Sequence, residues 1–216
     1  TMNATLLEIV LIGTVLANLA ILGSSRLATG IEVVRIQGLL LGFLPALLAD
    51  SWYEARVLFL ACAAIGLKCI VFPRILLRTM READVRHEVQ HSVGFSASIV
   101  AGVALLALSF WISSRLKLPM ELPSQLLLPV SFSTILIGLL LIISRKTALS
   151  QVIGYLILEN GIFVFGVSVA REEPLLVETG ILLDIFAAVF VMGIAIFHIS
   201  REFDTVEIER LSSLRD

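Results

Sequence analysis

The feature that most constrains this chain is a series of apolar segments, each long enough to cross a lipid bilayer. Because a helix rises about 1.5 Å per residue, about 20 apolar residues span a hydrocarbon core about 30 Å thick. Within lipid, only helices and closed barrels satisfy every backbone polar group. The sequence therefore predicts an all-α polytopic membrane protein with seven transmembrane helices. They lie at about residues 5–22, 31–49, 54–72, 92–113, 125–144, 148–169 and 176–199.

The overall composition supports the same class of protein. Of the 216 residues, 58% are hydrophobic and 16% are charged. A soluble domain is about 45–50% apolar and about 25% charged. This apolar composition indicates a lipid bilayer around the chain. No basic run suggests a nucleic acid partner, and the net charge of -2 says nothing about one. Residues 1–25 contain no Lys or Arg, so we expect the first segment to be a retained helix and not a cleaved signal peptide.

Lys and Arg in the loops predict how the helices are oriented. Cytoplasmic loops of membrane proteins carry an excess of these residues. If the seven segments alternate across the membrane, ten basic residues fall on the side of the C-terminus and four on the side of the N-terminus. We therefore predict an outer N-terminus and an inner C-terminus.

Outside the apolar segments, one loop is long enough to have a structure of its own. Residues 74–91 mix both charge signs, which predicts a short amphipathic cytoplasmic helix that could dock a soluble partner. His87 and His91 are four residues apart, but no third ligand accompanies them, so we interpret them as part of a solvated face. The predicted parts are a four-helix part with this loop (1–124), a three-helix part (125–200) and a cytoplasmic tail (201–216).

The most informative polar residue is Glu159, which lies with Asn160 in the middle of an apolar segment. No Lys or Arg occurs between Lys146 and Arg171, so Glu159 is roughly 20 Å from the basic end of its helix. An isolated charge at that depth costs several kcal/mol, and such residues usually face other helices or internal water. We interpret Glu159 as a functional proton site. The alternative is a protonated carboxyl group that only accepts structural hydrogen bonds.

Two further polar residues share the helical face of Glu159. Gln151, Tyr155 and Glu159 are spaced at i, i+4 and i+8, which places them in one stripe. A polar stripe facing lipid is very unfavourable, so we expect this one to face protein or water.

Three other ionisable residues inside the predicted helices are candidate partners of Glu159: Lys68, Asp184 and Glu32. Asp184 is roughly 24 Å from Arg201 along its helix, so its depth differs from that of Glu159 by about one turn. The sequence therefore predicts two carboxyl groups at similar depth, with a lysine available to influence their charge.

The sequence allows two interpretations of Lys68. It lies about four residues before an expected inner helix end at Pro73, so its side chain could reach the membrane surface. Ala61 and Ala64, however, share its helical face and leave room for a packed helix or for water. We favour the second interpretation, in which Lys68 is functional.

The remaining candidates lie nearer the ends of the predicted helices. Glu32 and Arg35 are neighbours at i and i+3, so they form either an interfacial ion pair or part of a proton entry. Glu178 begins the last segment, and His198 ends it as an interfacial histidine. Cys62 and Cys69 lie too far apart on one helix for a disulfide, and the chain has no C-x-x-C pair that would suggest an iron–sulfur cluster.

Together these residues resemble a known family. The sequence from Ile153-Gly154 to Glu159-Asn160-Gly161, then Leu176 to Ile181 and Asp184 to Ala187, resembles the membrane component E of hydrogenase-4 and formate hydrogenlyase-type complexes. The similarity extends back to Lys68 and covers most of the chain. The last three helices also resemble the K subunit of respiratory complex I and the C subunit of Mrp antiporters.

The resemblance implies a non-catalytic membrane-arm subunit of a complex I-like group 4 hydrogenase in the cell inner membrane. Its expected partners are antiporter-like and other membrane subunits, together with a soluble redox arm. That arm would hold the iron–sulfur clusters and the nickel–iron site, and this chain would hold no cofactor. The implied proton relay is Glu159, Asp184, Lys68 and Glu32, supported by Tyr155, Asn160, Gln151, Glu178, His198 and Arg35.

This chain departs from the K-subunit pattern, and other roles remain open. The two K-subunit glutamates would align with Leu156 and Ala188, whereas this chain has Glu159 and Asp184, each about one turn closer to the outer face. The main alternative is a purely structural subunit that links antiporter-like subunits. A free-standing seven-helix transporter or retinal protein is disfavoured, because Lys68 is not in the final helix.

Overall fold

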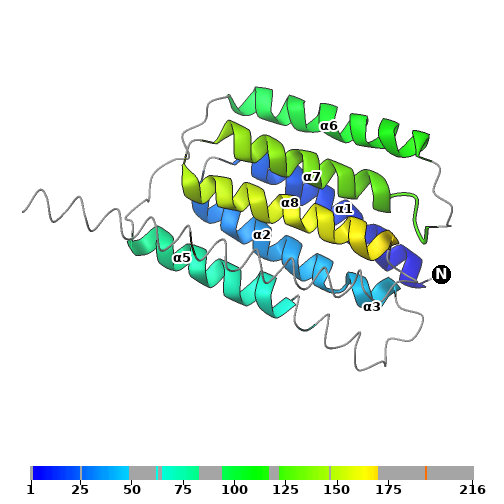
Figure 1. Cartoon of the computed structure of the whole chain (residues 1–216), viewed down its shortest axis with the longest axis horizontal. Helices are drawn as coiled ribbons and strands as arrows, with labels where there is room; N and C mark the ends of the chain where they lie inside the picture. Colours follow the sequence, from blue (N-terminus) through cyan, green and yellow to red (C-terminus); the bar gives the residue numbers. More distant parts are fainter. Residues whose placement is uncertain are drawn as a thin grey trace, which may run out of the picture.

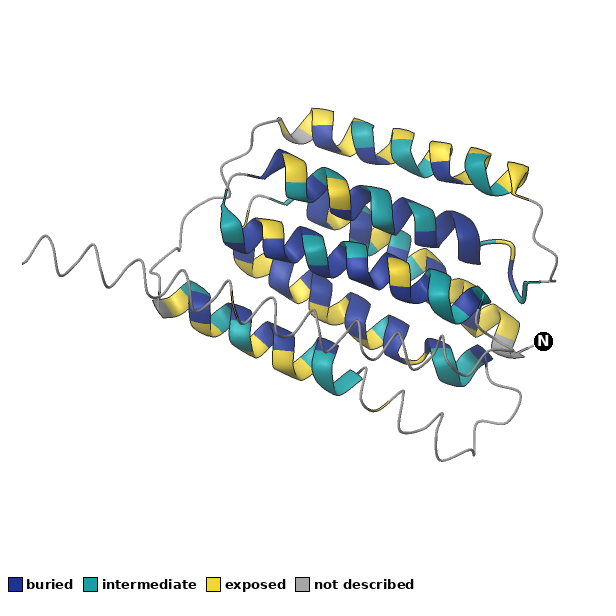
Figure 2. Ribbon diagram, in the orientation of Figure 1, coloured by how far each residue is buried: buried dark blue, intermediate teal, exposed yellow. Residues whose placement is uncertain are grey.

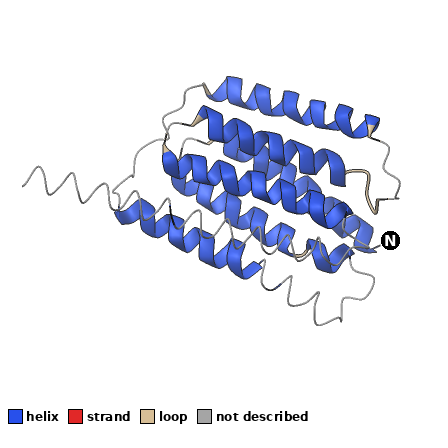
Figure 3. Ribbon diagram, in the orientation of Figure 1, coloured by secondary structure: helices blue, strands red, loops and turns tan. Residues whose placement is uncertain are grey.

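The described part of the chain is entirely helical. The computed structural model describes residues 2–24, 26–48, 62, 65–82, 94–116, 122–145, 147–169 and 193. These residues form helices and a few short turns beside them, with no strand among them (Figure 3). The elements are α1 (Met2–Leu22), α2 (Leu27–Gly42), α3 (Leu44–Leu48), the π-helix η1 (Gly66–Val71), α5 (Phe72–Glu82), α6 (Phe95–Arg115), α7 (Leu127–Ser144) and α8 (Ala148–Val169).

Five of these helical segments are long and apolar enough to cross a membrane. They correspond to five of the seven predicted helices, and the all-α prediction is confirmed for the described residues. Most of the predicted helix 54–72 and all but one residue of the helix 176–199 lie outside the described ranges. The count of seven and the outer N-terminus therefore stay predictions. The five segments are Ala4–Leu22, Leu27–Leu48, Ser96–Arg115, Leu127–Ser144 and Ala148–Val169.

Two helical hairpins form the centre of the bundle (Figure 1). The first hairpin is α1 and α2, the second is α7 and α8, and they pack with α1 against α7 and α2 against α8. Helix α6 covers α7 and α1 on one side, while η1 and α5 lie against α2 on the other. Figure 2 shows that the buried residues of α7 and α8 concentrate between the helices, whereas α6 is mainly exposed.

The helix around Pro73 differs from the prediction. We expected Pro73 to end a transmembrane helix before a separate solvated helix, but η1 runs directly into α5 through Pro73. Proline lacks an N–H group and crowds the preceding turn. That turn is wider here, because the N–H of Phe72 bonds to the carbonyl of Leu67, five residues earlier. Of residues 74–91, those up to Glu82 are helical, and Leu76 is buried in the core; the rest lie outside the described ranges.

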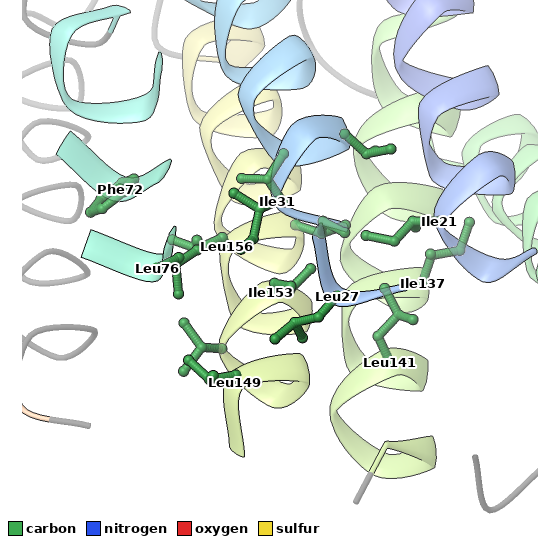
Figure 4. Packing of buried hydrophobic residues seen from close by; sticks show 14 of the residues in the cluster. Ile21, Leu27, Ile31, Phe72, Leu76, Ile137, Leu141, Leu149, Ile153 and Leu156 are labelled. Carbon is green, nitrogen blue, oxygen red and sulfur yellow. The ribbon is translucent and has the colours of Figure 1, made fainter. Parts of the chain in front are cut away.

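The buried apolar residues form two clusters, one toward each end of the bundle. The first cluster joins α1, α2, α5, α7 and α8 (Figure 4), and the second joins α1, α2, α3, α7 and α8. Along each of α1, α2, α7 and α8, buried polar residues occur between the two clusters. The bundle therefore has a polar layer enclosed by apolar packing on both sides. Its members are Thr14, Asn18, Gln37, Ser131, Ser133, Thr134, Glu159 and Asn160, together with Lys68 of η1.

Arg145 links the end of α7 to the turn between α1 and α2. Its Nη2 donates hydrogen bonds to the carbonyl oxygens of Ile21 and Ser24, each at 3.3 Å. Carbonyls at a helix end have no partner within their own helix, so a basic side chain can satisfy them. Burial lowers the pKa of Arg145 below its ordinary value, although a guanidinium keeps its charge in proteins.

The substitution Arg145→Met is expected to destabilise the protein by about 2 kcal/mol, because two carbonyl groups lose a charged donor. Arg145→Lys should retain part of this stability, since lysine keeps the charge but lacks the forked geometry. Thermal unfolding of the purified protein in detergent measures both effects. Equal unfolding temperatures for all three proteins would contradict this role.

Candidate functional site

The polar layer contains a buried ion pair between η1 and α8. The Nζ of Lys68 donates to both carboxylate oxygens of Glu159, at 2.7 and 2.9 Å, and to Oδ1 of Asn160 at 2.9 Å. Lys68 is 1% exposed and Glu159 is 2% exposed. The ammonium also lies 4.5 Å from the centre of the Phe163 ring, a distance at which a cation and a ring attract.

Lys68 reaches this position because its helix packs very closely against α2. A Cβ atom at Gly38 would lie 2.5 Å from Cβ of Lys68 and 3.3 Å from its carbonyl carbon. Only glycine leaves room for that approach. The structure thus contradicts the reading in which Lys68 extends to the membrane surface, since its ammonium points into the bundle.

Glu159 is positioned by an equally close contact between α7 and α8. A Cβ at Gly138 would lie 2.5 Å from the backbone nitrogen of Leu158, the residue before Glu159. Similar contacts occur at Gly154, 2.9 Å from the nitrogen of Ile142, and at Gly161, 2.6 Å from the nitrogen of Ile135. Small residues let membrane helices approach closely, and here they fix α8 against α7 on both sides of the carboxylate.

A row of buried hydrogen bonds extends from the ion pair across the bundle. Asn160 Nδ2 donates to Gln37 Oε1 at 3.2 Å, and Gln37 Nε2 donates to Asn18 Oδ1 at 2.7 Å. Asn18 Nδ2 donates to Thr134 Oγ1 at 2.8 Å, and Thr134 Oγ1 donates to the Val130 carbonyl at 2.7 Å. We call Asn160, Gln37, Asn18 and Thr134 the amide chain.

Most of the amide chain was not predicted from the sequence. Asn160 is among the predicted supporting residues, but Gln37 and Thr134 are not. The sequence does contain a signal for such a chain. A carboxamide buried inside an apolar helix needs hydrogen-bond partners, and Asn18, Gln37 and Asn160 are three such groups. What the sequence does not contain is the rotation of each helix that turns them toward one another.

The other predicted members of the polar stripe follow α8 toward the loop that precedes it. Tyr155 is half-buried and packs against the first apolar cluster. Gln151 is exposed, and its Nε2 donates to the carbonyl of Arg145 at 3.1 Å. The stripe therefore runs from the buried carboxylate to an exposed end of the helix.

Glu32 and Arg35 form a separate ion pair. Arg35 Nη1 lies 3.4 Å from Glu32 Oε2, and the two side chains are 55% and 56% exposed. They lie on the exposed face of α2, whereas Gln37 and Gly38 are on its buried face. The structure thus does not bring Glu32 into contact with Glu159, and a role in proton entry stays a prediction.

Comparisons with known proteins find relatives along nearly the whole chain. It is 29% identical to hydrogenase-4 component E of Escherichia coli over 194 residues, which cover 89% of this chain and 88% of that protein. The chain is a homologue of hydrogenase-4 component E. This component E homologue is also 28% identical to the uncharacterized protein Rv0085 of Mycobacterium tuberculosis, over 94% of this chain and 93% of that protein.

The C-terminal part of the component E homologue also matches a protein-family model. Residues 126–216 match the family model for NADH-ubiquinone/plastoquinone oxidoreductase chain 4L. The range contains α7 and α8, and therefore Glu159 and Asn160. No solved structure is significantly similar to the chain. The sequence-based resemblance to component E is confirmed, including the complex I-like nature of the last helices.

Several predicted site residues of the component E homologue lie outside the described ranges. They include Asp184, so its position relative to Glu159 stays a prediction, as do the positions of Glu178 and His198. His87 and His91 are also outside. Within the described ranges, no group of three or more His, Cys, Asp or Glu side chains is placed to hold a metal ion.

Proposed function

We propose that this component E homologue is a non-catalytic membrane subunit of a complex I-like hydrogenase and takes part in its proton translocation. The single observation that carries the proposal is the buried ion pair of Lys68 and Glu159, whose carboxylate lies in the middle of the membrane-spanning helix α8. Such groups are rare within membranes and usually mark ion or proton pathways. The similarity to hydrogenase-4 component E and to chain 4L supports the type of complex.

The chemistry of the pair follows from its charges. An ammonium at hydrogen-bond distance favours the carboxylate form of Glu159, and moving that charge away favours proton uptake. In a medium of low dielectric constant, a small change in the distance between the charges changes their interaction strongly. A conformational change in a neighbouring subunit that separates Glu159 from Lys68 would therefore load Glu159 with a proton, and the return of the two groups to contact would release it.

The packing around the pair favours sideways transfer within the membrane. Apolar clusters lie on both sides of the polar layer, so they restrict water along the bundle axis. We expect protons to pass between Glu159 and Asp184 and then to antiporter-like subunits, with Glu32 near an entry route. Moving one charge against 100 mV requires about 2.3 kcal/mol, which redox chemistry in a soluble arm with iron–sulfur clusters and a nickel–iron site would supply.

The substitution Glu159→Gln tests the proposal in the complete complex. Glutamine keeps the shape and can still bond to Lys68, but it cannot exchange a proton. We expect hydrogenase activity with artificial electron carriers to stay near the wild-type level, while coupled proton movement into membrane vesicles falls at least about 100-fold, the lower end of the effect of losing a positioned acid or base. Glu8→Gln is the matched control, because Glu8 is an exposed glutamate of α1.

The alternative is a structural subunit whose buried pair only holds helices together. The close glycine contacts of Gly38 and Gly138 would serve that role equally well. A scaffold predicts that Glu159→Gln and Asp184→Asn leave proton movement unchanged in every complex that assembles. Full coupling in Glu159→Gln would therefore reject the relay and leave the scaffold.

A further inference from the structure

The amide chain has one direction throughout. Lys68 Nζ donates to Asn160, Asn160 to Gln37, Gln37 to Asn18, Asn18 to Thr134, and Thr134 to the Val130 carbonyl. Every donor in this row therefore points away from the ammonium. The row crosses from η1 through α8, α2 and α1 to α7.

The two ends of the row require this direction. A lysine ammonium has only donors, so Asn160 must present its oxygen to Lys68 and its nitrogen to Gln37. Each following amide is then constrained in the same way. At the other end, the backbone carbonyl of Val130 can only accept, so the Thr134 hydroxyl donates to it and accepts from Asn18. The two ends therefore fix the orientation of all three carboxamides in the same direction, with the oxygen of Asn160 toward Lys68.

Burial makes this arrangement energetically important. Gln37, Asn18 and Thr134 are each 0% exposed, and Asn160 is 1% exposed. Hydrogen bonds in a low-dielectric interior strengthen one another, and a buried polar group without a partner is costly. The oxygen ends of the aligned amide dipoles face Lys68, so the chain attracts a positive charge at that position.

We propose that the amide chain keeps Lys68 protonated and in place when Glu159 takes up a proton, so that Glu159 alone changes charge. The inference rests on the proposed function and assigns the proton to one member of the ion pair. When Glu159 becomes neutral, Lys68 loses the charge of that partner, and the aligned dipoles continue to stabilise the ammonium. Gln37, Asn18 and Thr134 are therefore positioning residues that act through Asn160.

The other titratable groups on described elements near the pair do not replace the amide chain. The charged side chains of α2 and α5 are exposed wherever the structure describes their exposure. The other titratable groups near the pair are half-buried or lie at the end of a helix. None of these groups bonds to Asn160, Gln37, Asn18 or Thr134 in the described part of the chain. They are Glu32 and Arg35 on α2, Cys69 on η1, Arg74, Arg78 and Arg81 on α5, Arg145 after α7 and Tyr155 on α8.

The pH profile of proton movement in the whole complex tests this inference. Gln37→Met fills a similar volume but breaks the row two bonds from Lys68. Weakening a charge-assisted hydrogen bond to the ammonium should shift the pH profile by about one unit. The shift should be toward lower pH, because an ammonium without the row depends more on the carboxylate as its countercharge, so Glu159 takes up a proton less readily. Gln125→Met is the matched control, since Gln125 is exposed in the turn before α7 and lies outside the row.

A second pair of variants keeps the test valid if Gln37→Met does not assemble. Thr134→Val is nearly isosteric and removes the hydroxyl at the far end of the row, four bonds from Lys68. It should shift the profile in the same direction by a smaller amount, and Thr134→Ser, which restores the hydroxyl, should behave like the wild type. A merely structural role predicts less assembled complex but an unchanged profile.

The outcomes separate this inference from the proposed function. If Glu159→Gln abolishes coupling while Gln37→Met and Thr134→Val leave the pH profile unchanged, the amide chain has no role in the charge of Lys68, and only this inference fails. If Glu159→Gln retains full coupling, the proposed function fails as well.

Discussion

The substitution Lys68→Met is expected to destabilise the protein by about 3–5 kcal/mol, the typical effect of removing one partner from a buried ion pair. In the variant, the carboxyl group of Glu159 loses its ammonium, and Asn160 Oδ1 loses a donor at the same position. Glu159 can reduce this effect by taking up a proton, so the destabilisation should be smaller at low pH and grow as the pH rises. Thermal unfolding of the purified complex at several pH values measures the change.

The double variant is the control that shows the effect belongs to the pair. Combining Lys68→Met with Glu159→Gln removes both charges, and the protein should regain most of the lost stability, because two neutral groups replace the ion pair. Arg74→Met is the matched control on the same continuous helix. Arg74 is exposed, so its replacement should change stability by less than about 1 kcal/mol. A double variant as unstable as Lys68→Met would show that the two residues do not act as a pair.

Part of this site could be predicted from the sequence. Glu159 and Lys68 are charged residues inside apolar segments, and burial in lipid demands a partner for each. The depth of a residue along its helix can be counted from the sequence, and this depth is enough to predict Glu159 and Lys68 as site residues. Glu32 was predicted in the same way, but it lies on an exposed face of its helix.

The rest of the site depends on features that residue types do not specify. The interpretation in which Lys68 extends to the membrane surface assumed that its helix ends at Pro73. In the structure, a single π-helical turn precedes Pro73 and the helix continues through it. The amide chain requires four helices to be rotated so that Asn160, Gln37, Asn18 and Thr134 meet. Such rotations are set by packing of whole helices, and in particular by where glycines allow backbones to touch.

Gly138 is the position where this packing is most sensitive to an added atom. A Cβ there would lie 2.5 Å from the backbone nitrogen of Leu158 and 2.6 Å from its Cα, closer than such atoms approach in real structures. Backbone cannot move aside as a flexible side chain can, so Gly138→Ala should push α7 and α8 apart. Overpacking of this kind typically destabilises by about 1–3 kcal/mol, and we expect the upper end of that range.

Gly166→Ala is the matched control, because a Cβ at Gly166 would meet no atom within 4 Å. It should leave thermal unfolding and the amount of chain in the purified complex unchanged. The displaced backbone in Gly138→Ala is Leu158, directly before Glu159, so complexes that still assemble should also couple proton movement less efficiently. Normal coupling together with reduced stability would show that the pair of Lys68 and Glu159 tolerates separation of the two helices. Loss of both together would show that the close α7–α8 contact holds the carboxylate at the distance that its chemistry requires.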